Sequence, residues 1–284
     1  MSGHDWPAPA KLNLFLLVTG RRDDGYHDLQ TVFQLLDFSD RLDFSLRDDG
    51  LVYRRQGADE VAEEADLVVR AARLLQHSTG CRQGVDIMVE KHLPMGAGLG
   101  GGSSDAATTL MALNQLWKLG LEADELARIG LSLGADVPVF IHGHSAWAEG
   151  VGERLEPIRL DESVWYVVIR PPCGISTAAI FADPELTRAS TPITIRAFLE
   201  GAGRNDCESV VRARYPEVDA ALNWLGQFSP ARLTGTGSCI FARFPGETEA
   251  RQVLEQAPAI YTGFVARGVD ESPLLARLTR EQGH

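Results

Sequence analysis

The chain has 284 residues and a net charge of −12, from 27 Lys and Arg against 39 Asp and Glu. This length suits one or two domains with a substantial core, and the apolar share of 44% excludes a disordered or fibrous protein. Nucleic acids and anionic membranes bind basic surfaces, so the acidic balance argues against both as partners. The composition therefore predicts a soluble globular protein with small-molecule ligands.

Targeting and cysteine patterns point to the cytoplasm. The apolar run at residues 12–18 is too short to span a bilayer and has neither a basic leader nor a cleavage pattern, so no export signal is expected. Cys81, Cys173, Cys207 and Cys239 lack metal or redox spacing. We therefore expect free thiols in a reducing compartment.

The first predicted strand covers residues 11–18. Alternation predicts that its side chains form two faces, one with Leu12, Leu14, Leu16 and Val18 and the other with Lys11, Asn13, Phe15 and Leu17. Lys11 and Asn13 should therefore share a face. Without further information, a lysine at such a position reads as a solvated strand end.

A turn, a helix and a second strand follow. Asp24 and Gly25 favour a turn that presents Tyr26, an aromatic side chain with a polar tip. A helix is predicted from about Asp66. Residues 85–90 alternate apolar and polar side chains, which indicates a strand exposed on one face.

The segment at residues 94–108 is rich in glycine, with five glycines from Gly96 to Gly102. Glycines let successive backbone N–H groups converge on an anion, and the helix that follows, capped by Ser103 or Ser104, presents its positive dipole end. The segment therefore predicts a phosphate-binding loop. Its expected residues are Pro94, Met95, Gly96, Ala97, Gly98, Leu99, Gly100, Gly101, Gly102, Ser103 and Ser104.

Other glycine motifs fit this loop less well. A Walker A loop needs a lysine after its last glycine, and Gly102 is followed by Ser103. Gly96, Gly98 and Gly101 do satisfy the dinucleotide pattern GxGxxG, but the preceding strand alternates and does not read as a buried parallel strand. The HRD and DFG motifs of protein kinases do not occur.

The next predicted helix covers residues 124–133 and stops at Gly134. Pro138 is expected to keep Val137 extended. Asp136 lies between this helix end and the proline, where an aspartate ordinarily forms a turn.

A domain boundary is predicted just after Glu153, because the segment at residues 157–163 is charged and lacks apolar periodicity. This divides the chain into domains at residues 1–155 and 156–284. The second domain should contain strands at residues 165–169, near Leu233 and at 239–244, and helices near residues 193–199, 205–215 and 218–228.

The glycine loop resembles that of the GHMP kinase superfamily, with Pro94, Gly98, Leu99, Ser103 and Ser104 in the matching places. Within that superfamily, further segments resemble the kinases that act on a cytidine diphosphate methylerythritol. These are PAKLNLFL from residue 9, DGYHDLQTVF from 24, LGADVPVF from 133, AEGVGE from 148 and LTGTGSCIFA from 233. The resemblance extends over nearly the whole chain.

This resemblance implies an α+β, two-lobed fold with a ribosomal-protein-like amino-terminal lobe and a ferredoxin-like carboxy-terminal lobe. It also implies transfer of phosphate from ATP, carried with Mg²⁺, to the C2 hydroxyl of the methylerythritol in the non-mevalonate isoprenoid pathway. We assign no metal ligands, because His142 and His144, on an expected strand, read as surface polar groups.

The resemblance further implies roles for individual residues. Lys11 and Asp136 would contribute to phosphoryl transfer. Tyr26 and Phe181 would sandwich the cytosine while His27 reads its polar edge. Four side chains would border the same pocket, namely Asn13, Phe33, Val151 and Thr177.

Some readings stay open at this point. Phe33 could instead belong to an aromatic core cluster. The second glycine loop, residues 234–238, is expected beside the active site, although it could be a simple hairpin. The matching kinases usually have Asn where this chain has Asp66, and a carboxylate cannot replace an amide donor toward the adenine.

Three alternative functions remain. One is another GHMP kinase, acting on mevalonate derivatives or homoserine, which would lack a cytosine pocket. The others are a dinucleotide-dependent oxidoreductase and a non-catalytic nucleotide- or RNA-binding module.

Overall fold

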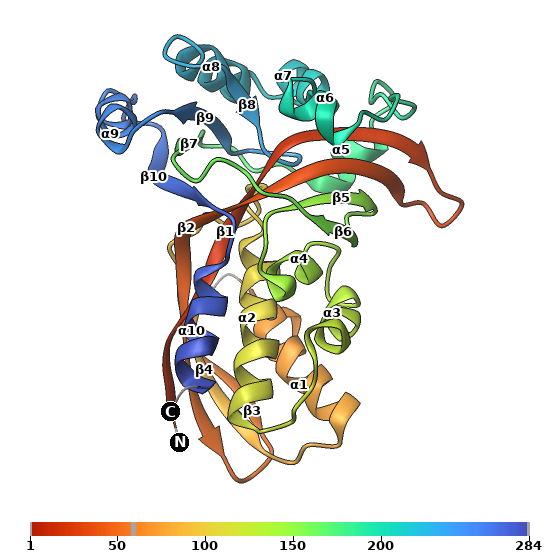
Figure 1. Ribbon diagram of the computed structural model, residues 1–284, viewed down its shortest axis with the longest axis vertical. Coiled ribbons are helices and arrows are strands. Elements are labelled where there is room, and N and C mark those ends of the chain that lie inside the picture. Colours follow the sequence, from red (N-terminus) through yellow and green to blue (C-terminus); the bar gives the residue numbers. More distant parts are fainter. Residues whose placement is uncertain (1, 58–60, 283–284) are drawn as a thin grey trace.

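The computed structural model describes residues 2–57 and 61–282 of the chain. It is an α+β protein with two lobes, and the predicted fold class is confirmed (Figure 1). The first lobe contains β1 (Ser2–Arg21), β2 (His27–Arg47), β3 (Val52–Gln56), the short 3-10 helix η1 (Glu63–Ala65), α1 (Leu67–Thr79), β4 (Gly84–Glu90), α2 (Gly101–Leu116), α3 (Ala123–Leu131), α4 (Val137–His142), β5 (Ala146–Gly150) and β6 (Arg154–Pro157). The remaining elements are β7 (Trp165–Arg170), α5 (Thr177–Ala182), α6 (Ile195–Leu199), α7 (Glu208–Arg214), α8 (Pro216–Leu225), β8 (Ala231–Leu233), β9 (Ile240–Phe244), α9 (Glu247–Glu255), β10 (Thr262–Val269) and α10 (Pro273–Gln282).

The long hairpin of β1 and β2 runs through both lobes (Figure 1). Strand β2 also pairs antiparallel with β4, β5 and β10, so the main path of the sheet runs β3-β4-β2-β10-β7-β9-β8. Helices α1 to α4 pack in the first lobe, and α7, α8 and α9 pack in the second (Figure 1). Because one hairpin reaches both lobes, it places residues of β1 directly between them.

The predicted alternation along β1 is only partly right. A β-bulge interrupts the pairing with β2 between Asn13 and Leu16. As a result Leu16 packs into the core of the second lobe, whereas Leu12 and Leu14 pack in the cluster behind the strand together with Phe15. An extra residue in a strand turns the following side chains to the opposite face. Lys11 and Asn13 lie before the bulge and do share a face.

Helix α2 begins at Gly101, so the expectation that Ser103 or Ser104 caps it is wrong. Gly100 is the N-cap residue, in the left-handed conformation with φ 73°, and no side chain caps the helix. Gly100 packs closely against the ring of Phe140. A Cβ at this position would collide with that ring, so a residue other than glycine would not fit here. Both serines therefore lie inside the first turns.

The region around Asp136 also differs from expectation. Val137 is not extended but is the first residue of α4, and Pro138 is the second. Proline is tolerated there because the first turn of a helix leaves its N–H groups unpaired. His142 ends the same helix and does not lie on a strand.

The buried side chains form three clusters. Two elements of these clusters cross the expected domain boundary. The tip of β1 packs in the core of the second lobe through Leu16 and Val18. Helix α10 returns to the first lobe, where Leu274 joins the core (Figure 1). The division at residues 155 and 156 stays a prediction.

Candidate active site

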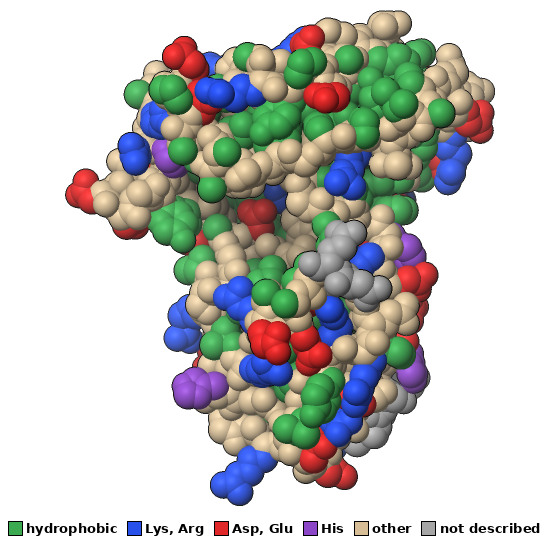
Figure 2. Space-filling model, turned by 180° about the vertical axis from the view of Figure 1, so that it is seen from behind, with side chains coloured by type: hydrophobic (Ala, Val, Ile, Leu, Met, Phe, Trp, Pro, Cys, Tyr) green, Lys and Arg blue, Asp and Glu red, His purple; other side chains and the backbone are tan. Residues whose placement is uncertain are grey.

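A cavity of about 660 Å³ lies where residues of both lobes meet. Figure 2 shows the surface hollowed between the two lobes. The cavity is lined by residues that are far apart in sequence, including the predicted Lys11, Asn13, Tyr26, His27, Phe33, Gly98, Gly100, Ser103, Asp136, Val151, Thr177 and Phe181. The structure thus brings both predicted catalytic residues and all of the predicted acceptor residues to one cavity.

Lys11 lines this cavity and is 3% exposed. Its Nζ donates to Asn13 Oδ1 at 2.6 Å and to the Gly98 carbonyl at 3.1 Å, and lies 3.3 Å from Asp136 Oδ2. The Phe33 ring centroid is 5.3 Å from the same ammonium. A buried ammonium needs hydrogen-bond and charge partners of this kind. Here they hold the ammonium beside Gly98 of the glycine loop.

Asp136 is more accessible than its lysine partner. Its side chain is 31% exposed against 4% for that of Lys11. It stands at the start of α4, whose N-terminal dipole favours a carboxylate, and no backbone amide is bonded to its side chain as a cap. The carboxylate is therefore held by Lys11 while it faces the cavity.

The two glycine loops contact each other beside Asn13. The backbone N–H of Asn13 donates to Thr234 Oγ1 at 3.0 Å, and this hydroxyl donates to the Gly98 carbonyl at 3.2 Å. A Cβ at Gly98 would lie only 2.2 Å from the Thr234 carbonyl oxygen. Only glycine permits this approach, and Gly235 and Thr236 of the second loop line the cavity.

The first glycine loop borders a second, smaller cavity of about 300 Å³. Gly96, Gly98 and Gly100 all have positive φ, as a loop of converging amides requires. Of the expected loop residues, this cavity is lined by Pro94, Met95, Gly96, Ala97, Gly98, Gly100, Gly101, Gly102 and Ser103. Leu99 and Ser104 line neither cavity, because both side chains are buried in the protein.

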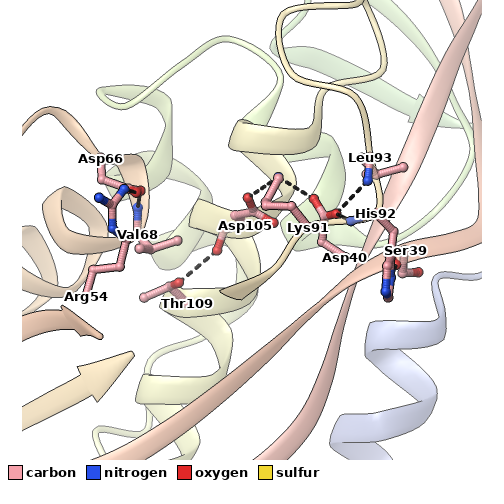
Figure 3. Close-up of polar contacts among 10 residues, drawn as sticks. All are labelled: Ser39, Asp40, Arg54, Asp66, Val68, Lys91, His92, Leu93, Asp105 and Thr109. Carbon is pink, nitrogen blue, oxygen red and sulfur yellow. Dashed lines mark hydrogen bonds and ion pairs between the residues drawn. The ribbon is translucent and has the colours of Figure 1, made fainter. Parts of the chain in front are cut away.

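Asp66 lines this second cavity and starts α1. Its Oδ1 accepts a hydrogen bond from the Val68 amide at 3.0 Å, and its Oδ2 is paired with Arg54 (Figure 3). The carboxylate therefore serves as a helix cap and an ion-pair partner.

A buried cluster of charges lies beneath the start of the same loop. Lys91 contacts carboxylates from two elements, Asp40 of β2 and Asp105 of α2 (Figure 3). Asp40 also accepts hydrogen bonds from the amides of His92 and Leu93 at 2.6 and 2.7 Å. The cluster thus joins the segment before the glycine loop to the helix after it.

Asp105 is the member of this charge cluster whose carboxylate is incompletely hydrogen-bonded. Its Oδ1 is buried without a hydrogen-bond partner among the described residues. Burial raises the pKa of Asp105 to about 7, an effect that the Lys91 charge opposes. Two carboxylates that share one ammonium leave an uncompensated negative charge in the interior when both are ionised.

The other end of the central cavity is aromatic. His27 and Phe181 stack with ring centroids 5.1 Å apart and an interplanar angle of 26°. Tyr26 is 63% exposed at the rim, and Thr177 shares a 2.9 Å hydrogen bond with Thr236. Flat rings at a cavity wall suit a planar ligand such as a nucleobase.

Arg188 does not line the cavity but contacts His27, which does, and it was not singled out from the sequence. Its Nε lies 3.3 Å from His27 Nε2, and its Nη2 donates to the carbonyls of Phe181 and Asp183. Burial, with the Arg188 and Arg21 charges, lowers the pKa of His27. His27 is thereby kept neutral, with Nε2 as the acceptor.

Thr31 was missed as well. Its Oγ1 accepts a hydrogen bond from Asn13 Nδ2 at 3.0 Å, which fixes the Asn13 amide so that its oxygen faces Lys11. A lone threonine or arginine carries no local pattern that would mark it as functional.

Other candidates stay outside the site. The four cysteines are free thiols, and burial raises the pKa of Cys207 and Cys239 to about 12. Within residues 2–57 and 61–282, no cluster of three or more His, Cys, Asp or Glu side chains is arranged to hold a metal ion. None of the helices in those ranges has the length and apolar character needed to cross a membrane.

Two lobes that meet at a glycine loop facing a lysine and an aspartate define a small-molecule kinase of the GHMP type. The model of the GHMP kinase N-terminal domain matches residues 66–144, and that of the C-terminal domain matches residues 185–263. The chain belongs to the GHMP kinase superfamily and, within it, to the family of 4-diphosphocytidyl-2-C-methyl-D-erythritol kinases. Membership implies the use of ATP.

The relatives that carry this family name match nearly the whole chain. The 4-diphosphocytidyl-2-C-methyl-D-erythritol kinase of Alkalilimnicola ehrlichii is 60% identical over 98% of this chain and 95% of its own length. That of Pseudomonas syringae pv. syringae is 56% identical over 96% of each chain.

Solved structures agree with the sequence relatives. A crystal structure of 4-(cytidine 5'-diphospho)-2C-methyl-D-erythritol kinase superimposes with a TM-score of 0.81 and 32% identity, covering 94% of this chain and 99% of the other. The mevalonate kinase of Methanococcus jannaschii is similar in fold, with a TM-score of 0.68 at 14% identity over 95% of this chain and 98% of its own.

Proposed function

We propose that this protein transfers the γ-phosphoryl group of ATP to the C2 hydroxyl of 4-diphosphocytidyl-2-C-methyl-D-erythritol. The observation that carries the proposal is the position of Lys11 and Asp136 between the glycine loop and the aromatic end of the cavity. In the reaction the bond from the γ-phosphorus to the bridging oxygen of ADP breaks, a bond to the substrate oxygen forms, and the hydroxyl proton leaves.

In this proposal Asp136 accepts the hydroxyl proton. Its carboxylate faces the cavity, and the ammonium of Lys11, 3.3 Å away, holds it in place. Phosphoryl transfer through a loose transition state needs alignment and charge neutralisation more than a strong base. Lys11 serves both needs, because it orients Asp136 and places a positive charge near the transferred oxygens.

The glycine loop holds the triphosphate through backbone N–H groups and the start of α2. Mg²⁺ would be carried by ATP and would neutralise charge on its phosphate oxygens, and we assign it no protein ligand. The protein acts in the cytoplasm.

The cytosine occupies the aromatic end of the cavity. Tyr26 and Phe181 stack on the base, and the neutral His27 bonds to its polar edge. Because Arg188 faces Nε2, the Nδ1–H group remains to donate to an acceptor of the ligand. Asn13, Phe33, Val151 and Thr177 border the rest of the acceptor site.

ADP release measured with several acceptors tests the proposal. We expect turnover with the cytidyl substrate and none with mevalonate or homoserine, since neither carries a base for the aromatic end. Equal turnover with mevalonate would overturn the assignment of the acceptor. No ADP release with any of the three, from protein that binds ATP, would overturn the proposed reaction.

A further inference from the structure

A cavity of about 380 Å³ lies in the second lobe and shares no lining residue with the two cavities described above. Its walls come from the strands β1, β2, β7, β8 and β9 and from the segment around the end of α6. Among its lining residues are three arginines, Arg159, Arg232 and Arg243, and a single acid, Asp161. Neither the glycine loops nor the catalytic pair uses this cavity.

Two of the three arginines interact with nearby carboxylates, and only at longer range, Arg243 with Asp161 and Arg159 with Asp270. No ion pair within 4.0 Å joins any of them to an acid in the part of the chain that the structure describes. Asp161 accepts hydrogen bonds from the amide and hydroxyl of Ser163, and the charge of Arg243 also acts on it. Asp270 and Glu162 do not line the cavity. The charge of Arg159 acts on the carboxylate of Asp270, which lies beside Glu162. In a chain of net charge −12, this cavity wall still carries a formal charge of +2.

The floor and rim of the cavity have different characters. Tyr166 lines the floor and is 1% exposed, and its hydroxyl makes only a long bond of 3.4 Å to Gln34 Oε1. At the rim Leu199 is 62% exposed, next to the half-buried Phe198. A molecule that filled the cavity would therefore meet both cationic groups and uncovered apolar surface.

We propose that this cavity binds a phosphate monoester dianion that carries a short apolar group. The charge of the lining residues matches that of the dianion, and guanidinium groups bind phosphate oxygens through paired hydrogen bonds. The apolar group covers Leu199 and Phe198. The volume is at the lower end of the range of about 300–1,000 Å³ for small-molecule sites.

Calorimetric titration of the full-length protein with phenyl phosphate tests the proposal. The central cavity is first occupied with a non-hydrolysable ATP analogue and Mg²⁺, so that the glycine loop is not available. We expect one phenyl phosphate bound per chain, and weaker binding of inorganic phosphate because it lacks the apolar group.

Arginine variants then locate the binding. Arg159→Gln and Arg243→Gln should each weaken phenyl phosphate binding by roughly tenfold, as expected for one lost charge-assisted hydrogen bond. Arg251→Gln, on α9 and paired with Glu247, is the matched control and should bind as the unchanged protein does. Arg232 is not a suitable test position, because its Nη1 also holds the Leu14 carbonyl at 2.9 Å.

Three results would overturn the proposal. The first is the absence of binding once the nucleotide analogue is present. The second is binding that survives Arg243→Gln, which would place the ligand outside the proposed cavity. The third is equal affinity for phenyl phosphate and inorganic phosphate, which would show that the apolar group of the ligand does not contribute to binding. Thermal melting and ADP release should be unchanged in Arg243→Gln, so that a loss of binding cannot be ascribed to misfolding.

Discussion

The ammonium of Lys11, on β1, lies 3.3 Å from a carboxylate oxygen of Asp136, at the start of α4. The lysine is buried and the aspartate is partly open to the cavity. This arrangement fixes the carboxylate from one side and leaves its other side open to the cavity. It also explains why a lysine at a strand position is not solvated here.

Asp136→Asn should abolish most of the turnover. Removal of a general base typically costs about 10²–10⁴-fold in rate. The affinity for ATP should be kept, because Asp136 is assigned to the acceptor. The measurement is ADP release with the cytidyl substrate, with nucleotide binding followed by titration. Asp124→Asn, at an exposed position of α3, is the control and should be fully active. Full activity of Asp136→Asn would remove this residue from the mechanism.

The parts of the site that were predicted from sequence are those with a local signal. The glycines from Gly96 to Gly102 marked the loop because their residue type itself permits the required conformation. The two-residue spacing of Lys11 and Asn13 marked a shared face, which the hydrogen bond between them confirms.

The parts that were missed depend on contacts between distant segments. The bulge after Asn13 lies where the Leu16 amide is bonded to the carbonyl of Arg204, a residue of the second lobe. Arg188 reaches His27 from a loop that has no periodic pattern. The helix α10 and the strand β10 were not assigned either. Leu274 of α10 packs into the core of the first lobe, and β10 pairs with β7 along most of its length and with β2 at its end.

Gly98→Ala should disrupt the site more than Gly96→Ala. Both positions have positive φ, so both changes carry the strain of about 1–2 kcal/mol for a left-handed side chain. At Gly98 the new Cβ would in addition meet the Thr234 carbonyl oxygen at 2.2 Å, whereas nothing lies within 4 Å at Gly96. Melting temperature and ATP affinity should fall further in Gly98→Ala. Similar losses in the two variants would show that contact between the glycine loops is not required.

Arg188→Gln should weaken binding of the cytidyl substrate by roughly tenfold, because His27 loses the hydrogen bond from the guanidinium that orients its ring. The KM for ATP should not change. Arg188 lowers the pKa of His27, so in the variant His27 should take up a proton at a higher pH than in the unchanged protein. Loss of substrate binding on acidification should therefore begin at a higher pH.

The His27 ring can be followed by NMR titration alongside KM. Arg214→Gln is the matched control, since Arg214 pairs with Asp183 of the same segment but does not contact His27. An unchanged pKa of His27 in Arg188→Gln would contradict the assigned contact.

Asp105→Asn should remove a pH dependence from the stability of the protein. Burial raises the pKa of Asp105 from 3.8 to about 7, so the folded state binds a proton that the unfolded state releases between these values. The free energy of unfolding should therefore fall as pH rises from about 4 to about 7.

In the variant this fall should be smaller, and the variant should melt above the unchanged protein at pH 8. Asp124→Asn, at an exposed position of α3, is the control and should melt as the unchanged protein does. The measurement is thermal unfolding at pH 5 and pH 8. A variant that melts lower than the unchanged protein at pH 8 would mean that the pair with Lys91 stabilises the fold more than burial of the second carboxylate costs.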